Sequence, residues 1–423
     1  MIPATLAQGL RPVRTELANG VVILAQESGT VPAVTITATF FAGSAQDPVA
    51  LPGVAYLTRR VIDRGAANRS AVQIADALDD RGVALRVTAS RDTFSVACDC
   101  LSEDLDDLLG LVADVIREPL FPQVELDKRR IEAMTSVRQD DDNPAVRSID
   151  ALVATLYGPT HPYGRPFKGT LASLQSIGRD PLVEFHRQHL QPSSLRLAIV
   201  GDVDPAAAVE AGSRYFESWR GTSVEQDVLA APPAARQRTI MRQVMPGKSQ
   251  SDIGYGFTAV RRLDPRYYAY WMMNNILGQF GLGGRLADNI RERQGMAYYA
   301  YSTLEARVSE GPLIVRAGVD PNNVERTLDA IDKEVSDLSR TGPTLAEFED
   351  TRQSLIGSIP RMLETNDGIC EFLLGAEQFG LGLDHDRRLP GLLRAVTLAA
   401  VHEAAAEILD PSRASIVVAG PAE

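Results

Sequence analysis

An arginine and a tyrosine in the second half of the chain have the types and spacing to bring a charge and a hydroxyl together at a turn between a helix and a strand. Arg291 and Tyr298 stand seven residues apart, with Gly295 between them. A glycine in this position is typical of the left-handed residue that ends a helix. We therefore expect Arg291 in the last helical turn and Tyr298 at the start of the next strand. The turn would bring a permanently charged guanidinium close to a neutral phenol hydroxyl.

The spacing of this pair is not evidence enough by itself. Arg and Tyr are common near turns between a helix and a strand, and Tyr299 and Tyr301 follow Tyr298 closely. A strand that is simply rich in tyrosine stays open as the alternative explanation.

The sequence contains few candidate metal ligands. The chain has five histidines, and the closest pair, His186 and His189, has no third ligand nearby in the sequence. We interpret this pair as an exposed helix end rather than a zinc site. Cys98 and Cys100 alternate along a strand-like run, which indicates small buried residues, and three cysteines cannot form a complete set of disulfides.

A glycine-rich stretch precedes the arginine. It contains Gly278, Gly281, Gly283 and Gly284, but it lacks the strand context and spacing of a phosphate-binding loop. Its composition is typical of a flexible connection between two helices.

The elements that must position these residues occur twice. PSSLRLAIVG at 192–201 and PSRASIVVAG at 411–420 stand 219 residues apart, and the apolar face of a predicted helix from Leu105 to Ile116 recurs at the same offset. The repeat predicts a duplicated domain of roughly 200 residues.

Each half is predicted to have an α+β fold, with a mostly antiparallel sheet covered by helices. Val34, Ile36, Ala38 and Phe40 alternate as one strand with a buried face. Proline, glycine and small polar residues indicate a linker between the halves. The predicted divisions are a first domain at 1–220, a linker at 221–240 and a second domain at 241–423.

Composition excludes some classes of protein. The net charge of −12 argues against a nucleic-acid binder, which needs basic patches. An acidic surface would suit a basic peptide, but it is also ordinary for a soluble protein. The sequence contains no run of about 18 apolar residues, so it predicts no membrane span. The first residues lack the features of a secretory signal.

Two runs near the start resemble a known family. FFAGSAQDP at 40–48 and PGVAYLTRRVIDRG at 52–65 resemble the opening motif of the pitrilysin/insulinase peptidases, which include the processing peptidases and the core proteins of the bc1 complex. In that family a Gly-x-Ala stretch leads into H-x-x-E-H on a helix. Residues four apart share a helix face, so two imidazoles can hold one zinc while the Glu activates its water.

The resemblance implies that the metal ligands are missing here. Tyr56 and Arg60 replace the two histidines, and Arg59 replaces the general base. The position that matches the third ligand, a glutamate in the family, is about Ser136; Glu132 lies one helical turn away from it. We therefore expect no zinc in this chain.

The resemblance also covers the Arg/Tyr run. In the family this pair reaches the zinc of the opposite domain, where it binds the substrate backbone and the oxyanion. It implies that Arg291 and Tyr298 are catalytic and substrate-binding residues contributed to a partner's zinc site. A glycine-rich patch in a similar place is tied to substrate handling in the non-catalytic mitochondrial subunit, so Gly283 and Gly284 are further substrate-binding candidates.

Three functional hypotheses follow. The first is the non-zinc subunit of a heteromeric bacterial metallopeptidase, paired with a homologous H-x-x-E-H chain that holds the zinc and acts on peptides. The second is a silent scaffold like the bc1 core proteins, which would have no need for the Arg/Tyr pair. The third, an autonomous enzyme with another chemistry, lacks a readable site. We expect a periplasmic location if an export signal was removed, and a cytoplasmic one otherwise.

Overall fold

The computed structural model resolves the chain into two compact units. Unit 1 contains residues 1–135, 167–227 and 358–388, and unit 2 contains residues 136–166, 228–357 and 389–423. Each unit therefore takes segments from both halves of the sequence. These units differ from the sequence ranges predicted from the repeat, and that division stays a prediction. The structure describes residues 9–29, 31–222, 229–233, 235–279 and 284–422.

Unit 1 is built on six strands, β1 (Val13–Glu16), β2 (Val22–Glu27), β3 (Ala33–Phe40), β6 (Arg86–Ala89), β7 (Phe94–Leu101) and β8 (Leu195–Gly201). They form one sheet in the order β1-β2-β8-β3-β7-β6. All neighbours are antiparallel except β2 and β8, which are parallel. Two further short strands, β4 (Gly65–Ala66) and β5 (Arg69–Ser70), pair separately.

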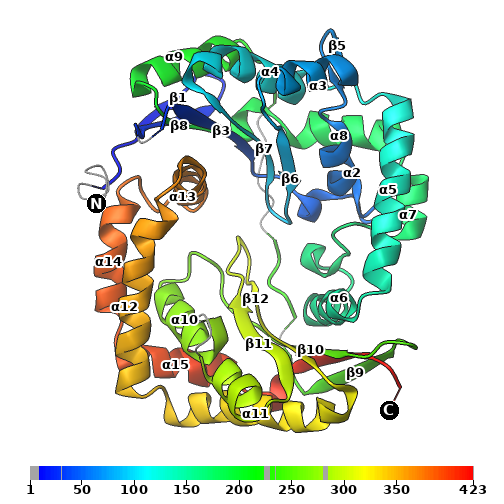
Figure 1. Ribbon diagram of the computed structural model, residues 1–423, viewed down its shortest axis with the longest axis vertical. Coiled ribbons are helices and arrows are strands. Elements are labelled where there is room, and N and C mark those ends of the chain that lie inside the picture. The colour runs from blue at the N-terminus through cyan, green and yellow to red at the C-terminus, as the bar shows by residue number, and fades with distance from the viewer. Residues whose placement is uncertain (1–8, 30, 223–228, 234, 280–283, 423) are drawn as a thin grey trace. The chain divides into compact units, whose positions relative to one another are not determined.

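The alternation predicted for β3 is confirmed. Val34, Ile36, Ala38 and Phe40 are all fully buried on one face of the sheet. This face is covered by helices of the first half, as Figure 1 shows. The nearest are α2 (Val54–Val61), α4 (Leu105–Arg117) and α9 (Pro205–Phe216).

The other face of β3 carries threonines. Thr35, Thr37 and Thr39 alternate with the apolar residues, and all three are buried. Their cover is α13 (Asn366–Gln378), which lies against β3 and β8. This helix comes from the second half of the sequence. We call this side of the sheet the threonine face.

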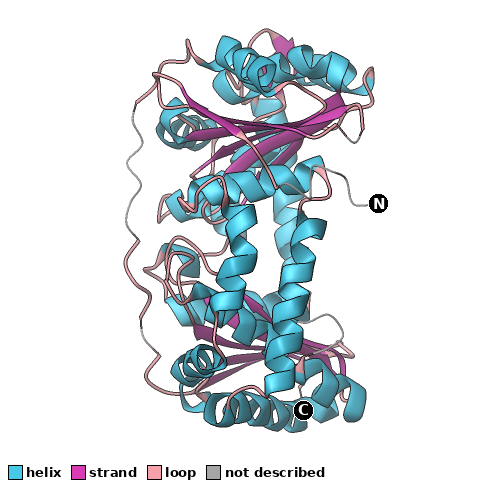
Figure 2. Ribbon diagram, turned by 90° about the vertical axis from the view of Figure 1, so that its left-hand side faces the viewer, coloured by secondary structure: helices cyan, strands magenta, loops and turns pink. Residues whose placement is uncertain are grey.

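Unit 2 repeats the arrangement with five strands, β9 (Thr239–Val244), β10 (Ser251–Thr258), β11 (Ala297–Leu304), β12 (Pro312–Val319) and β13 (Ser415–Gly420). Their order is β11-β12-β10-β13-β9, and only β13 and β9 are parallel. The order and directions equal those of β6-β7-β3-β8-β2. The predicted α+β fold with a duplicated, mostly antiparallel sheet is confirmed, and Figure 2 shows helices against the sheet of each unit.

The two halves exchange one helix each. α6 (Pro144–Tyr157) belongs to the first half but lies on β10 and β13 of unit 2. α13 of the second half holds the equivalent place on unit 1. A self-comparison of the sequence finds the repeat but not the exchange, because the apolar pattern of a helix does not say which sheet it covers.

The remaining helices frame these layers. None of the helices in the described residues is both long and apolar enough to cross a membrane. Their bounds are α3 (Ala71–Asp79), α5 (Gln123–Asp141), α7 (Leu171–Ser176), α8 (Arg179–His189), α10 (Tyr267–Asn274), α11 (Val324–Thr341), α12 (Leu345–Met362), α14 (His385–Ala395) and α15 (Leu398–Ile408).

The helix exchange makes a prediction about stability. Leu373 on α13 is fully buried. Leu373→Ala should cost about 2–5 kcal/mol, because it removes apolar contact and leaves a cavity. Hydrogen exchange should show lost amide protection in β3 and β8 of unit 1. Leu345→Ala, at a site that is 65% exposed, is the control and should change little. Protection lost first in β10 and β13 would contradict the assignment of α13 to unit 1.

Candidate functional site

The helix α2 carries the residues that replace the expected zinc motif. It begins after Gly53, whose φ is +102° and whose added Cβ would lie 2.7 Å from the carbonyl oxygen of Lys168. A residue larger than glycine would therefore be strained there. The buried Asp47 carboxylate accepts hydrogen bonds from the backbone N–H groups of Gly53 at 2.7 Å and Ala55 at 2.8 Å. These contacts fix where α2 starts.

Two guanidinium groups surround Tyr56 on this helix. Tyr56 is 1% exposed. The Arg59 guanidinium carbon lies 4.5 Å from the centre of the Tyr56 ring, and that of Arg60 lies 5.6 Å from it. Arg60 Nη1 also lies 3.4 Å from the Tyr56 hydroxyl oxygen. The Tyr56 ring thus attracts both guanidinium groups through cation–π interactions.

Glu132 on α5 completes this group, and our sequence analysis did not select it. Its carboxylate accepts a hydrogen bond from Arg60 Nη2 at 2.9 Å and from Arg129 Nη1 at 2.8 Å. The two arginines, Arg129 first, lower the pKa of Glu132. An arginine side chain is longer than a histidine side chain. Arg60 therefore pairs with Glu132, one helical turn before the position that was expected to match the third zinc ligand. Ser136 stands at that position and is half-buried.

These residues do not fit a zinc ion. A guanidinium has no lone pair to offer a metal, and Tyr56 already packs against two of them. Within the part of the chain that the structure describes, no three His, Cys, Asp or Glu side chains are grouped to hold a metal ion. The chemistry of this cluster, formed by Tyr56, Arg59, Arg60, Arg129 and Glu132, is therefore that of an ion-paired contact between α2 and α5.

The histidine pair on α8 has a packing role. His186 Nε2 lies 2.7 Å from the carbonyl oxygen of Ile116, and its ring meets Phe121 edge to face. Burial lowers the pKa of His186. The His189 ring packs against Phe185 with the centres 5.0 Å apart. The prediction of an exposed helix end was wrong in one respect, because the rings of His186 and His189 are both half-buried.

Arg291 lies at the end of a π-helical segment, η6 (Ala287–Arg293). Gly295 has a φ of +60°, as expected for the residue that ends the helix. The Arg291 side chain is 41% exposed, and its Nε lies 3.3 Å from the Glu292 carboxylate. A second π-helix, η5 (Asn275–Gln279), precedes it. π-Helical turns are rare and often occur at functional sites.

Tyr298 lies at a β-bulge. In the pairing of β11 with β12, Ala297 opposes Val319 and Tyr299 opposes Gly318, which leaves Tyr298 as the extra residue. β11 is an edge strand, and Tyr298 is 71% exposed. A bulge on an edge strand re-aims a side chain, and bulges are frequent next to active sites. The bulge also breaks the simple alternation of faces that a regular strand would impose.

The neighbouring tyrosines have structural contacts instead. The Tyr299 hydroxyl donates to the Asp252 carboxylate, and burial followed by this hydrogen bond raises the pKa of Tyr299. An added Cβ at Gly318 would lie 2.6 Å from the Tyr299 ring, so glycine makes room for it. Tyr301 packs under the guanidinium of Arg316. Of the three tyrosines, Tyr298 is exposed, whereas Tyr299 and Tyr301 are half-buried.

The glycine candidates stand just before η6. Gly283 lies outside the described residues. Gly284 has a φ of +94°, and an added Cβ would lie 3.0 Å from the Gly278 Cα. Close backbone packing therefore explains this glycine, and its role in substrate binding stays a prediction.

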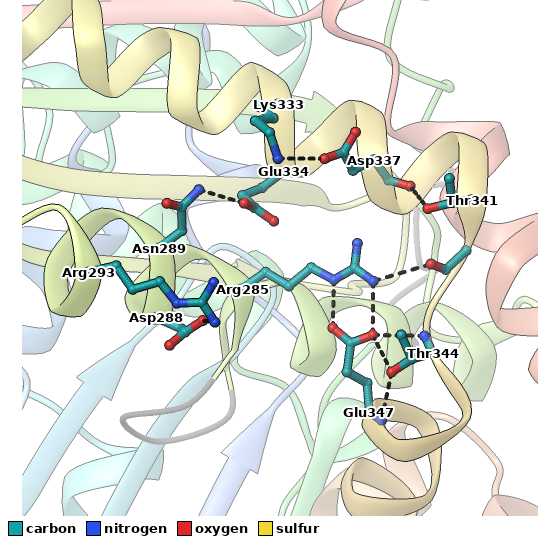
Figure 3. Close-up of polar contacts among 11 residues, drawn as sticks. Arg285, Asp288, Asn289, Arg293, Lys333, Glu334, Asp337, Thr341, Thr344 and Glu347 are labelled. Carbon is teal, nitrogen blue, oxygen red and sulfur yellow. Dashed lines mark hydrogen bonds and ion pairs between the residues drawn. The ribbon is translucent and has the colours of Figure 1, made fainter.

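A polar network holds η6 to its neighbours, and Figure 3 shows its members. Arg285 makes a two-pronged ion pair with Glu347 of α12, with distances of 2.7 and 2.9 Å. Asn289 of η6 donates to Glu334 of α11 at 2.6 Å. Glu347 also caps α12 together with Thr344. The segment that carries Arg291 is thus fixed at its start and middle.

Comparison with known proteins agrees with the motifs. A profile described as "Insulinase (Peptidase family M16)" matches residues 22–170, and one described as "Peptidase M16 inactive domain" matches residues 176–355. The chain belongs to the pitrilysin/insulinase-type peptidase family M16. The cluster on α2 lies in the first match, and the Arg/Tyr segment lies in the second.

Bacterial proteins resemble the chain along most of its length. An uncharacterized zinc protease of Mycobacterium bovis is 26% identical, with 99% of this chain and 95% of that protein covered. The zinc protease YmxG of Bacillus subtilis is 24% identical, with coverage of 84% and 87%. The crystal structure of a peptidase M16 inactive domain from Pseudomonas fluorescens has a TM-score of 0.91, 26% identity and 98% coverage of both chains. A Helicobacter pylori protease shares the fold, with a TM-score of 0.88, 17% identity and coverage of 98% of this chain and 100% of that one.

The cluster on α2 predicts that this M16 chain holds no zinc when purified, as elemental analysis can check. The triple change Tyr56→His, Arg59→Glu and Arg60→His should still bind zinc more weakly than about 1 μM, because residue 136 lacks a carboxylate and Arg129 still claims Glu132. Adding Ser136→Glu should tighten binding. Nanomolar affinity in the triple variant would show that the third ligand is assigned to the wrong position.

The network around η6 predicts a pH dependence of stability. Burial would raise the pKa of Glu347, but Arg285 and Thr344 outweigh it and lower that pKa to about 2. A depressed carboxylate pKa stabilises the fold above the ordinary value of about 4.5 and loses that contribution as the pH falls toward 2. Glu347→Gln should lower Tm at pH 7 and flatten the fall of Tm between pH 4.5 and 2. An unchanged acid profile in Glu347→Gln would contradict this. Glu349→Gln, on the same helix, is the control.

Proposed function

We propose that this M16 chain is the zinc-free, substrate-binding subunit of a two-chain metallopeptidase that hydrolyses peptides. The observation that carries the proposal is the β-bulge that exposes the Tyr298 hydroxyl a few residues after the half-exposed Arg291. The arginine cluster on α2 also supports the proposal, since a chain without zinc needs a zinc-bearing partner to take part in hydrolysis.

The chemistry asked of this chain is electrostatic. When a peptide carbonyl is attacked, its oxygen gains negative charge, and a donor fixed at that oxygen stabilises the transition state more than the ground state. Tyr298 would donate one hydrogen bond to that oxygen. Arg291 would hold the substrate backbone with its fork of N–H donors. The partner's zinc would polarise the same carbonyl and activate water.

The alternative is a scaffold of the kind found among the bc1 core proteins. A scaffold has no use for an exposed hydroxyl on a bulged edge strand. The two proposals therefore differ in what removal of that hydroxyl does.

Variants at the pair separate the two proposals. With Tyr298→Phe, the reconstituted pair should lose about 10²–10³ in kcat, because one oxyanion donor is removed with little change in volume. Arg291→Ala should cost as much or more. Zinc content and complex formation, measured on the same samples by elemental analysis and gel filtration, should not change.

The control must remove a hydroxyl elsewhere in unit 2. Tyr268→Phe on α10 serves, whereas Tyr299→Phe does not, because its hydroxyl holds Asp252. Peptide cleavage at the wild-type rate by both Tyr298→Phe and Arg291→Ala would favour the scaffold. So would a failure of the chain to bind any H-x-x-E-H homologue from its own genome.

A further inference from the structure

Arg59 differs from the other two arginines of the cluster on α2, because it has no carboxylate partner. Arg60 and Arg129 both donate to Glu132, at 2.9 and 2.8 Å. Within the part of the chain that the structure describes, Arg59 makes no hydrogen bond and no ion pair, and its guanidinium contacts the Tyr56 ring instead. The carboxylate of this cluster is thus shared by two arginines, and the charge of Arg59 is left without a counter-ion.

The Arg59 guanidinium is held in place with its outer edge accessible. The residue is half-buried, and its Nε is buried without a hydrogen-bond partner. Its two Nη groups also lack a partner, but they are not buried, so solvent reaches them. The Tyr56 ring against which the guanidinium lies is 1% exposed and meets Phe167 edge to face, with the ring centres 5.7 Å apart. A buried ring therefore fixes one face of the group.

This arrangement fits an anionic ligand, and a carboxylate in particular. A guanidinium has only donors, and its planar fork matches the two oxygens of a carboxylate. Half-burial removes part of the hydration of Arg59 without supplying a negative charge, a cost that a bound anion would offset. Because the Tyr56 ring already orients the side chain, a ligand has less rotational freedom to remove when it binds.

We propose that Arg59 binds a carboxylate of the peptide substrate, either an aspartate or glutamate side chain or the C-terminal carboxylate. The inference rests on the proposed function, because it takes the ligand to be a peptide. It assigns Arg59 to peptide binding at the position where the family motif has its general base. A basic side chain would be repelled there, since Arg60 and Arg129 lie in the same cluster.

Binding of peptides to the isolated chain tests this assignment without any hydrolysis. The probes are three N-acetylated pentapeptides of Ala and Gly around a central residue. One has a central Glu and an amidated C-terminus, one has a central Gln and a free C-terminus, and the neutral reference has a central Gln and an amidated C-terminus. Isothermal titration calorimetry should give about tenfold tighter binding of at least one charged peptide than of the reference. Which of the two binds tighter identifies the source of the carboxylate.

Matched variants assign that preference to Arg59. Arg59→Gln should bind all three peptides equally while keeping the fold, with Tm lowered by no more than about 4 °C, because it loses only a cation–π contact. Arg59→Lys keeps the charge without the fork, so it should weaken the preferred peptide about threefold or more. Arg220→Gln should keep the wild-type preference. Arg220 is an exposed arginine of unit 1 that also makes no hydrogen bond or ion pair within the described residues.

Four results would overturn the proposal. They are equal affinity of the wild-type chain for the three peptides, a preference that survives Arg59→Gln, a preference that is lost in Arg220→Gln, and no binding at about 1 mM peptide. The proposed function is tested separately by Tyr298→Phe, which is measured as turnover of the reconstituted pair, so either proposal can fail without the other.

Discussion

A guanidinium keeps its charge at every pH that a protein meets, so each half-buried arginine needs a carboxylate, a carbonyl or an aromatic face beside it. All but four of the 43 Lys and Arg residues here are arginines. Arg60 ties α2 to α5, Arg86 ties β6 to α13, and Arg285 ties the start of η6 to α12. The helix α2, the strand β6 and the start of η6 are each fixed to a neighbour by such a pair, in addition to apolar packing.

The cluster on α2 shows how this constraint is met at the place where the family motif has its zinc ligands. A zinc held by the family motif would join the helix of the two histidines to the helix of the third ligand. Here Arg60 and Glu132 join α2 to α5 through an ion pair, and Tyr56 covers the guanidinium groups. The two helices are thereby held together by an ion pair and an aromatic contact.

The sequence is informative where a local pattern decides the outcome. The alternation in β3, the end of η6 at Gly295 and the duplicated sheet follow from periodicity and spacing. Glu132 was missed because its contact depends on the length of the arginine that replaces histidine. The bulge at Tyr298 was missed because it depends on the register between β11 and β12. The π-helical turns were missed because apolar periodicity does not separate i→i+5 from i→i+4 hydrogen bonds. The cover that α13 gives to the threonine face could not be predicted, since the apolar pattern of a helix does not say which sheet the helix covers.

The exchange of α6 and α13 has a consequence for the order of events during synthesis. A ribosome releases the chain from its N-terminus, so the strands of unit 1 emerge long before residues 358–388. Until α13 arrives, the buried threonines of β3 have no cover. Unit 2 also waits, because β13, the strand between β10 and β9, ends at Gly420. The nascent chain must therefore hold two unfinished sheets until β13 has emerged.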